Sequence, residues 1–303
     1  MLKLRCLFIL ICNLIAIPQI HAYKHSIEEA QNPNEENIFE SVEFSNSSNL
    51  LPEKFCNKVI ASYPKKVRLI VTDTVSNNLK QNFLILHGAS GTGKSLLARI
   101  ITQKNGKPFL TVKSYYVENK TAENMRKVAL HAARSNCNVI IEGIEGFIKK
   151  ELSSLNQHTG PLSEMLKILH HYNLLLIGVT HESELLEPLQ RRINLQLCKL
   201  EAPKDILATV RTVNAILSRK ETNIHSPQTI VDFAQLVTGR SQWTIEHIIR
   251  LAYEDALCDI PVDNTPTITL EYLKAALKII NHNTALLKGQ SPKKESVIHC
   301  SVQ

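Results

Sequence analysis

The feature that most constrains this chain is a cluster of glycines followed by a lysine and a serine. The chain has 303 residues and only ten glycines, against an average glycine share of about 7%. Glycine reaches backbone conformations that other residues avoid, so a chain that uses it sparingly concentrates it where the backbone must turn in an unusual way. The cluster reads Gly88-Ala89-Ser90-Gly91-Thr92-Gly93-Lys94-Ser95, which fits the pattern G-x-x-x-x-G-K-[ST].

The residue types in this loop suit the wrapping of a polyphosphate. Glycines let backbone N–H groups surround an anion without crowding side chains, and a helix that begins at Lys94 presents its N-terminus to the same charge. Lys94 supplies positive charge for β- and γ-phosphates, and Ser95 supplies a hydroxyl for Mg²⁺. An apolar run at 83–87 predicts the buried strand that must precede such a loop. Residues 88–95 are therefore predicted to bind ATP, with Ser95 as a metal ligand.

The rest of the body alternates between apolar runs and helical patterns. Five strands are predicted, at 83–87, 108–113, 138–142, 173–179 and 194–198. Helices are predicted before them at 51–61 and 65–79, and between them at 94–104, 121–135, 162–171 and 184–191. Such alternation indicates an α/β fold, with a parallel five-stranded sheet that carries helices on both faces.

After Glu201 only helical patterns follow, at 203–219, 226–237, 241–257 and 269–280. Ser226, Ser241 and Thr269 are suitable N-cap residues for three of these helices. We therefore expect a core domain over 51–200, a small all-helical domain over 201–283 and a loose tail over 284–303.

The N-terminal residues resemble a targeting segment. Lys3 and Arg5 precede an apolar run, and Ala22 offers a small residue at a plausible cleavage point, which is the pattern of a secretory signal peptide over 1–22. Residues 23–50 are acidic and rich in Asn and Ser, as in a disordered linker. We expect an exported protein, and the alternative is a membrane tether formed by residues 6–20.

Composition narrows the class of protein. With 44% apolar and 21% charged residues, disorder throughout, collagen-like repeats and a coiled-coil rod are excluded. The net charge is +7, which suits nucleic acid or anionic membrane as a partner, but no run of five like charges occurs and a solvated surface is favoured. The seven cysteines include no C-x-x-C pair, so neither a zinc site nor a disulfide framework is indicated.

Four segments beyond the loop resemble AAA ATPases, in the narrow-sense branch of the AAA+ superfamily. An apolar strand ending in acids, a second strand, an arginine-bearing segment and the start of a lid helix occur in the family's order, at 138–147, 174–181, 186–192 and 238–241. The resemblance covers about 51–283. It implies a five-stranded parallel core, a helical lid, assembly into a homo-oligomeric ring that is usually hexameric, and remodelling of a protein substrate.

The resemblance also implies roles for single residues. Glu142 stands where the family has an Asp that organises Mg²⁺, and His181 stands where it has a polar sensor that helps to place the attacking water. Arg192, together with Arg191 in one version, would reach the γ-phosphate bound by the neighbouring subunit. Tyr116-Val117 falls near the aromatic pair that grips a polypeptide in the pore of the ring.

The chain also departs from the family pattern. Gly143 stands where the family has its catalytic Glu, and the loss of a general base costs about 10²–10⁴-fold in rate. Glu145 is the alternative carboxylate for this role, but it lies three residues after Glu142 and is expected to point elsewhere. Gln242-Trp243 replaces two small residues that let the lid approach adenosine, and a Gly-Arg pair after the arginine segment is missing. These departures weaken hydrolysis or threading more than ATP binding.

Each assignment has a plainer alternative. Glu142 and Glu145 can be solvated loop acids, His181 a loop histidine, and Arg191 with Arg192 a solvated helix end. Trp243, the only tryptophan, is expected in the core of the helical domain rather than as an adenine platform. The leading function is an ATPase that remodels protein, and the alternative is a nucleotide-binding scaffold or switch with little turnover. A small-molecule kinase and a DNA-handling relative are less favoured, and membrane contact is expected only through an uncleaved N-terminal segment.

Overall fold

The computed structural model describes residues 42–44, 50–76, 82–114, 121–154, 160–220, 223–224, 226–259 and 266–287. The expected signal peptide, most of the expected linker and tail, and Tyr116-Val117 lie outside the described residues. The chain divides into two compact units, Met1–Ser41 and Val42–Gln303. All of the described helices and strands belong to Val42–Gln303.

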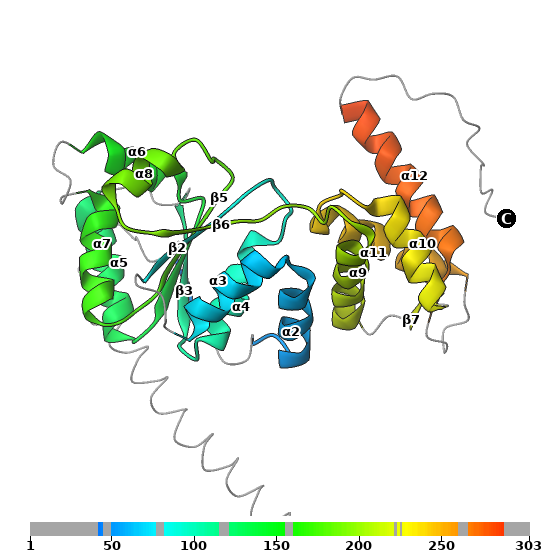
Figure 1. The fold of residues 1–303 in the computed structure, drawn as a ribbon, viewed down its shortest axis with the longest axis horizontal. Helices are drawn as coiled ribbons and strands as arrows, with labels where there is room; N and C mark the ends of the chain where they lie inside the picture. Colours follow the sequence, from blue (N-terminus) through cyan, green and yellow to red (C-terminus); the bar gives the residue numbers. More distant parts are fainter. Residues whose placement is uncertain are drawn as a thin grey trace, which may run out of the picture. The chain divides into compact units, whose positions relative to one another are not determined.

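The core is a six-stranded sheet in the order β1-β3-β4-β5-β2-β6 (Figure 1). Its five parallel strands confirm the predicted sheet. They are β2 (Phe83–His87), β3 (Phe109–Lys113), β4 (Asn138–Glu142), β5 (Leu176–Thr180) and β6 (Gln196–Lys199). The sixth strand, β1 (Val42–Phe44), pairs antiparallel with β3. It corrects the expectation of a linker through residue 50, since three residues are too few to give a periodic signal.

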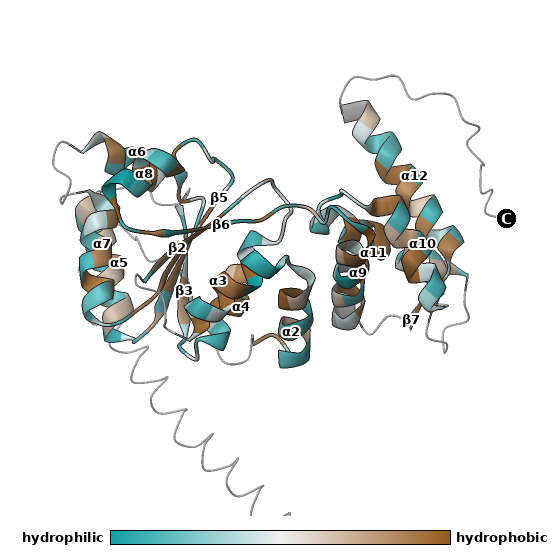
Figure 2. Cartoon of the chain, in the orientation of Figure 1, coloured by the Kyte–Doolittle hydropathy of each residue, from teal (hydrophilic) through white to brown (hydrophobic). Residues whose placement is uncertain are grey.

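Helices cover both faces of the sheet, as predicted (Figure 1). One face carries α2 (Glu53–Ser62), α3 (Lys65–Val75) and α4 (Lys94–Lys104), and the other carries α5 (Ala122–Arg134) and α7 (Pro161–His171). The remaining core helices are α6 (Glu145–Ser153) and α8 (Leu186–Arg192). The strands between the two layers are apolar (Figure 2), and β5 is buried along its whole length, as expected for a sheet covered on both faces.

The helical domain comprises α9 (Ile206–Lys220), α10 (Pro227–Val237), α11 (Gln242–Cys258) and α12 (Leu270–Leu287). It has its own apolar core, in which Phe233, Ile245 and Ile249 are fully buried. The Ser226 and Ser241 side chains accept hydrogen bonds from the backbone of α10 and α11, so both predicted N-caps are confirmed.

Two expectations for the helical domain need correction. It also contains a parallel pair of two-residue strands, β7 (Asn223–Ile224) and β8 (Thr267–Ile268), so it is not all-helical. The last helix runs to Leu287, past the expected boundary at 283, because residues 281–287 contain no proline or glycine to stop it. Among the residues that the structure describes, no helix is both long enough and apolar enough to cross a bilayer.

Candidate functional site

The glycine cluster forms a loop between β2 and α4. Gly88, Gly91 and Gly93 adopt φ angles of +139°, +74° and +84°, the region that side chains disfavour. A Cβ on Gly88 would lie 2.1 Å from the carbonyl oxygen of Leu200, so the close approach of two backbones excludes any side chain there. The helix α4 begins immediately after Gly93, which aims its N-terminus at the loop.

Lys94 is tucked beneath this loop. Its Nζ donates hydrogen bonds to the carbonyl oxygens of Gly88 (2.8 Å) and Ala89 (2.7 Å), and the Thr92 hydroxyl donates to the same Ala89 oxygen (2.9 Å). Burial lowers the pKa of the Lys94 ammonium, and the negative charge of Glu145 acts in the opposite direction. The loop is thus already closed around one cation, which bound phosphates would share.

A second loop, the acidic turn over Glu142–Glu145, follows β4 at the same edge of the sheet. Glu142 is the last residue of β4 and lies in register with Lys113 of β3 and Val179 of β5. Gly143 has a φ of +70°, and its N–H donates to the Val179 carbonyl (3.0 Å). The turn is therefore fixed by backbone contacts to β5, the strand that separates β4 from β2.

Glu145 does not point away, as the sequence analysis expected; it lies inside the site. It is 8% exposed, and its Oε1 accepts hydrogen bonds from the Thr180 hydroxyl (2.7 Å) and the His181 N–H (3.1 Å). Burial alone would raise the pKa of this carboxyl, but the hydrogen bonds from Thr180 and from backbone N–H groups lower it. The carboxylate is therefore charged at neutral pH.

His181 lies beside this carboxylate. Its Nδ1 is 3.1 Å from Oε1 of Glu145, and its side chain is 70% exposed. The structure thus brings together the predicted sensor position, the end of β5 and the Glu145 carboxylate, which was expected to point elsewhere. The signal that could have found Glu145 is its place in the first turn of α6, a helix that was not predicted.

The two arginines at the end of α8 differ in placement. Arg192 is 12% exposed, and its guanidinium donates to the Ser154 carbonyl (3.0 Å) and lies 3.6 Å from a carboxylate oxygen of Glu151. Arg191 is 77% exposed and pairs with Glu187 on the same helix. Arg191 is thus the arginine that a second protein can reach.

Arg192 instead belongs to an internal junction. Its partner Glu151, at the end of α6, is fully buried and accepts hydrogen bonds from the backbone N–H groups of Leu162 (2.9 Å) and Ser163 (3.2 Å). These are the first N–H groups of α7, which have no partner inside their own helix. One carboxylate therefore joins α6, α7 and α8.

The start of α11 contacts the glycine loop directly. The Trp243 N–H donates to the Gly91 carbonyl (3.0 Å), and a Cβ on Gly91 would lie 2.9 Å from the Ser241 hydroxyl. The buried Tyr63 hydroxyl lies 3.2 Å from the Thr92 carbonyl and 3.3 Å from Oε1 of Gln242.

Trp243 was expected in the core of the helical domain, and that expectation is wrong. The side chain is 63% exposed and stacks on His247, with ring centroids 5.2 Å apart. Because the backbone of Trp243 contacts Gly91 and its ring is exposed, an aromatic ring lies at the rim of the site.

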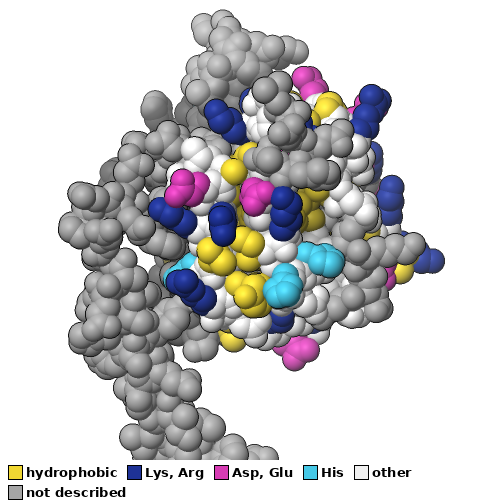
Figure 3. All heavy atoms as spheres, turned by 90° about the vertical axis from the view of Figure 1, so that its left-hand side faces the viewer, with side chains coloured by type: hydrophobic (Ala, Val, Ile, Leu, Met, Phe, Trp, Pro, Cys, Tyr) yellow, Lys and Arg dark blue, Asp and Glu magenta, His cyan; other side chains and the backbone are white. Residues whose placement is uncertain are grey.

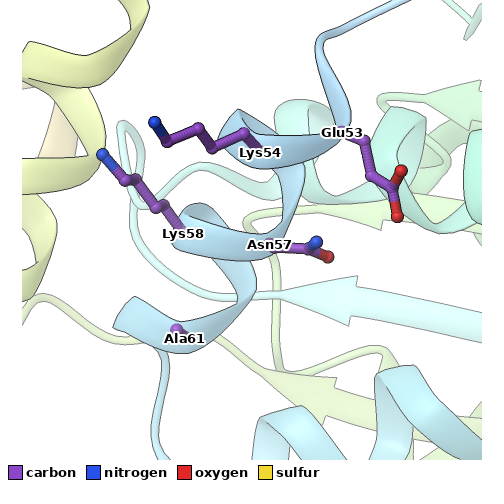
Figure 4. A pocket seen from close by; sticks show the side chains of 5 residues that line it. All are labelled: Glu53, Lys54, Asn57, Lys58 and Ala61. Atoms are coloured by element: carbon purple, nitrogen blue, oxygen red, sulfur yellow. The ribbon is translucent and has the colours of Figure 1, made fainter.

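Two further surfaces have mixed character. A groove along α2 is lined by Glu53, Lys54, Asn57, Lys58 and Ala61 (Figure 4), with its two lysines turned to the side opposite Glu53. On the face seen in Figure 3, basic side chains are interspersed with acidic, apolar and histidine side chains. On this face the charges form no continuous basic stripe of the kind that nucleic acid attracts.

Comparison with known proteins finds ATPases that are similar to this chain in sequence and in structure. A family model described as "ATPase family associated with various cellular activities (AAA)" matches residues 84–201. The peroxisomal ATPases PEX6 of Rattus norvegicus, Cricetulus griseus and Mus musculus are each 27% identical over 158 residues, or 48% of this chain. The match covers only 16% of the length of each PEX6 protein.

Two solved structures have a similar fold. The FIGL-1 AAA domain in complex with ADP is 16% identical, with a TM-score of 0.54 over 84% of this chain and 97% of its own. A katanin structure, described as the basis of katanin self-assembly, is 17% identical, with a TM-score of 0.51 over 80% of this chain and 88% of its own. At such low identity the likeness shows the fold.

Proposed function

Residues 84–201 form an AAA ATPase domain, and from that premise we propose that this chain binds and hydrolyses ATP to remodel a protein substrate within a ring of identical subunits. The observation that carries the proposal is the glycine loop, whose three positive φ angles and buried Lys94 are those of a phosphate cradle.

The residues of the site fit ATP with Mg²⁺. The loop offers backbone N–H groups and the N-terminus of α4 to the phosphates, and Ser95 and Glu142 offer the hydroxyl and carboxylate oxygens that Mg²⁺ prefers. When bound, Mg²⁺ would neutralise charge on the phosphates. Lys94 would turn from the Gly88 carbonyl toward the β- and γ-phosphates, and His181 would help to place the attacking water.

Assembly into a ring is argued from the two arginines at the end of α8. Arg191 is exposed where the resemblance expects an arginine that reaches a neighbouring subunit, whereas Arg192 is held within its own chain. We therefore propose Arg191 as the residue that acts on the neighbour's nucleotide. The similarity to katanin, whose structure concerns self-assembly, supports a homo-oligomer, for which a hexamer is our proposal.

The first test is steady-state phosphate release from ATP with Mg²⁺ by the full chain and by Lys94→Ala. We expect release to fall about 100-fold or more, since Lys94 is the cation of the cradle. Arg99→Ala, which removes an exposed charge from the same helix, is the matched control and should keep the wild-type rate. Equal rates for wild type and Lys94→Ala would contradict an ATPase.

A second measurement addresses the ring. Sedimentation with and without ATP should show a larger species with ATP, and Arg191→Ala should lower turnover in that species more than Arg192→Lys does. A monomer at all ATP concentrations would remove the ring from the proposal.

The second candidate function is a nucleotide-binding switch with little turnover. It is favoured by Gly143, which carries no carboxylate, and by the direct contact of Trp243 and Gly91. In that case ATP would bind and change the emission of Trp243, the only tryptophan, while phosphate release stays at the level of Lys94→Ala.

We further propose that the protein is exported through residues 1–22, with a tether at 6–20 as the alternative. N-terminal sequencing of the expressed protein tests cleavage, and an intact Met1 would contradict it.

A further inference from the structure

We propose that Glu145 is the catalytic carboxylate of this site, positioned to hold the attacking water and to accept its proton. The inference deepens the proposed function and rests on it. It assigns the role of general base to a residue in the first turn of α6, because the residue directly after β4 is Gly143, which has no carboxylate.

The first step is position. A Cβ built on Gly143 has an oxygen of Glu145, Oε2, as its nearest neighbour at 3.5 Å, and Ser114 follows at 4.0 Å. An added Cβ at 143 would thus be in ordinary contact with Oε2, so the carboxylate of Glu145 borders the space that a longer side chain at 143 would enter. A carboxylate thus does stand beside the acidic turn, although it comes from two residues further along the chain.

The second step is orientation. The hydrogen bonds from the Thr180 hydroxyl and the His181 N–H both go to Oε1, and Nδ1 of His181 is also close to Oε1. One oxygen is thus held against the end of β5, and this fixes Oε2 on the side of Gly143. A carboxylate held through one oxygen presents the other in a defined direction, which a general base requires.

The third step is proximity to the phosphate site. Thr180, whose hydroxyl donates to Oε1 of Glu145 (2.7 Å), lies in register with His87 of β2, the residue directly before the glycine loop, so the carboxylate stands at the neighbouring strand end. Lys94 and His181 are the cationic or titratable groups that face it from α4 and from the end of β5. A water molecule between Oε2 and a γ-phosphate on the loop would lie among these groups.

The reaction balances with these residues alone as acid and base. The water oxygen forms a bond to the γ-phosphorus, and the bond from that phosphorus to the β,γ-bridging oxygen breaks, leaving its electron pair on ADP. The proton lost by the water passes to Oε2 of Glu145 and then to the departing phosphate, which restores the carboxylate.

The decisive variant is Glu145→Gln. The amide keeps the size of the side chain and an oxygen for Thr180, but it cannot accept a proton. We expect the turnover number to fall about 100-fold or more, while the dissociation constant for ATP stays within threefold. Nucleotide that remains bound after gel filtration should be ATP in the variant and ADP in the wild type.

Two controls make the assignment specific. Glu182→Gln removes a half-buried carboxylate next to His181 that pairs with Lys149, and it should keep the wild-type rate. Gly143→Glu should not raise turnover, because φ of +70° disfavours a side chain and a second carboxylate would enter the space of the first. A tenfold rise in Gly143→Glu would show that the site lacks a base and would overturn the proposal.

The outcomes separate this inference from the proposed function. If the wild type shows no Lys94-dependent hydrolysis, both the ATPase and this role of Glu145 are wrong. If the wild type hydrolyses ATP and Glu145→Gln does so at the same rate, only the assignment of Glu145 is wrong.

A further variant covers the case in which Glu145→Gln fails to fold, as judged by circular dichroism. Thr180→Val removes a hydrogen bond that lowers the pKa of the carboxyl. The acidic limb of the rate profile should therefore move to higher pH, and an unmoved limb would overturn the proposal.

Discussion

The glycine loop and the acidic turn lie at the same edge of the sheet and follow strands of equal length, yet they keep their chemistry in different ways. In the loop the backbone itself is the binding group, so each glycine must stand at its own position. In the turn the working group is a side chain, and a carboxylate can arrive from any residue whose backbone aims it there. A missing residue in the loop therefore removes a site, whereas a missing residue in the turn can be replaced from nearby.

If the acidic turn depends on tertiary partners, the largest effect should come from the junction that holds α6. Arg192→Ala leaves the buried Glu151 without its cation, and loss of one partner of a buried pair costs about 3–5 kcal/mol. We expect a matching fall in the free energy of unfolding, measured in urea, together with loss of turnover. Arg191→Ala, at an exposed pair, should cost less than about 1 kcal/mol, and equal costs would contradict the junction.

The next effect concerns the backbone of the glycine loop. Gly88→Ala would place a Cβ 2.1 Å from the Leu200 carbonyl oxygen, and such overpacking costs about 1–3 kcal/mol in addition to strain. We expect a lower melting temperature and loss of ATP binding, and calorimetry measures both.

Gly106→Ala is the control for Gly88→Ala. Gly106 also has a positive φ, of +78°, but nothing lies within 4 Å of its added Cβ. The free energy of unfolding of Gly106→Ala should therefore fall only by the cost of strain, about 1 kcal/mol, and the variant should keep its affinity for ATP. Loss of ATP binding in both variants would mean that strain alone, and not the contact with Leu200, disables the loop.

The acidic turn should tolerate the equivalent change. At Gly143 an added Cβ meets nothing nearer than 3.5 Å, so Gly143→Ala should cost only about 1 kcal/mol of strain. ATP affinity should stay within twofold, measured by titration of Trp243 fluorescence. A loss of affinity as large as that of Gly88→Ala would erase the difference between the two loops.

The smallest effect is a dependence of stability on pH. Because the pKa of Glu145 is lower in the folded chain, its contribution is present above the unfolded pKa and is lost as pH falls through the folded pKa. Thermal midpoints taken from pH 7 down to pH 3 should therefore fall less in Glu145→Gln than in the wild type. Parallel curves would indicate that the hydrogen bonds of this carboxyl add nothing to stability.

Much of the fold could be predicted from the sequence because apolar periodicity and glycine position are local signals. The five parallel strands and the start of α4 at Lys94 were predicted in this way, with small errors at the strand ends. The helix α6 was missed because it begins among glycines and buries a charged residue, Glu151, that periodicity counts as exposed.

The part of the site that could be predicted is the glycine loop, in which the backbone itself is the binding group. The direction of Glu145 depends on α6 and on Thr180, 35 residues away, and that of Arg192 depends on Glu151, to which no local pattern connects it. The exposure of Trp243 likewise depends on where α11 begins relative to the loop. Side-chain direction is a tertiary property, so a residue's place in a family pattern does not determine where its side chain points.

The contact between Gly88 and Leu200 has a mechanical consequence. Leu200 is the first residue after β6, where the chain turns toward the helical domain, and its N–H donates to the His87 carbonyl at 2.8 Å. Torque applied to the helical domain would therefore reach the first residue of the glycine loop through rigid peptide groups, with no compressible side chain between them. The residue that connects the sheet to the helical domain is therefore also in contact with the residue at which the phosphate-binding loop begins.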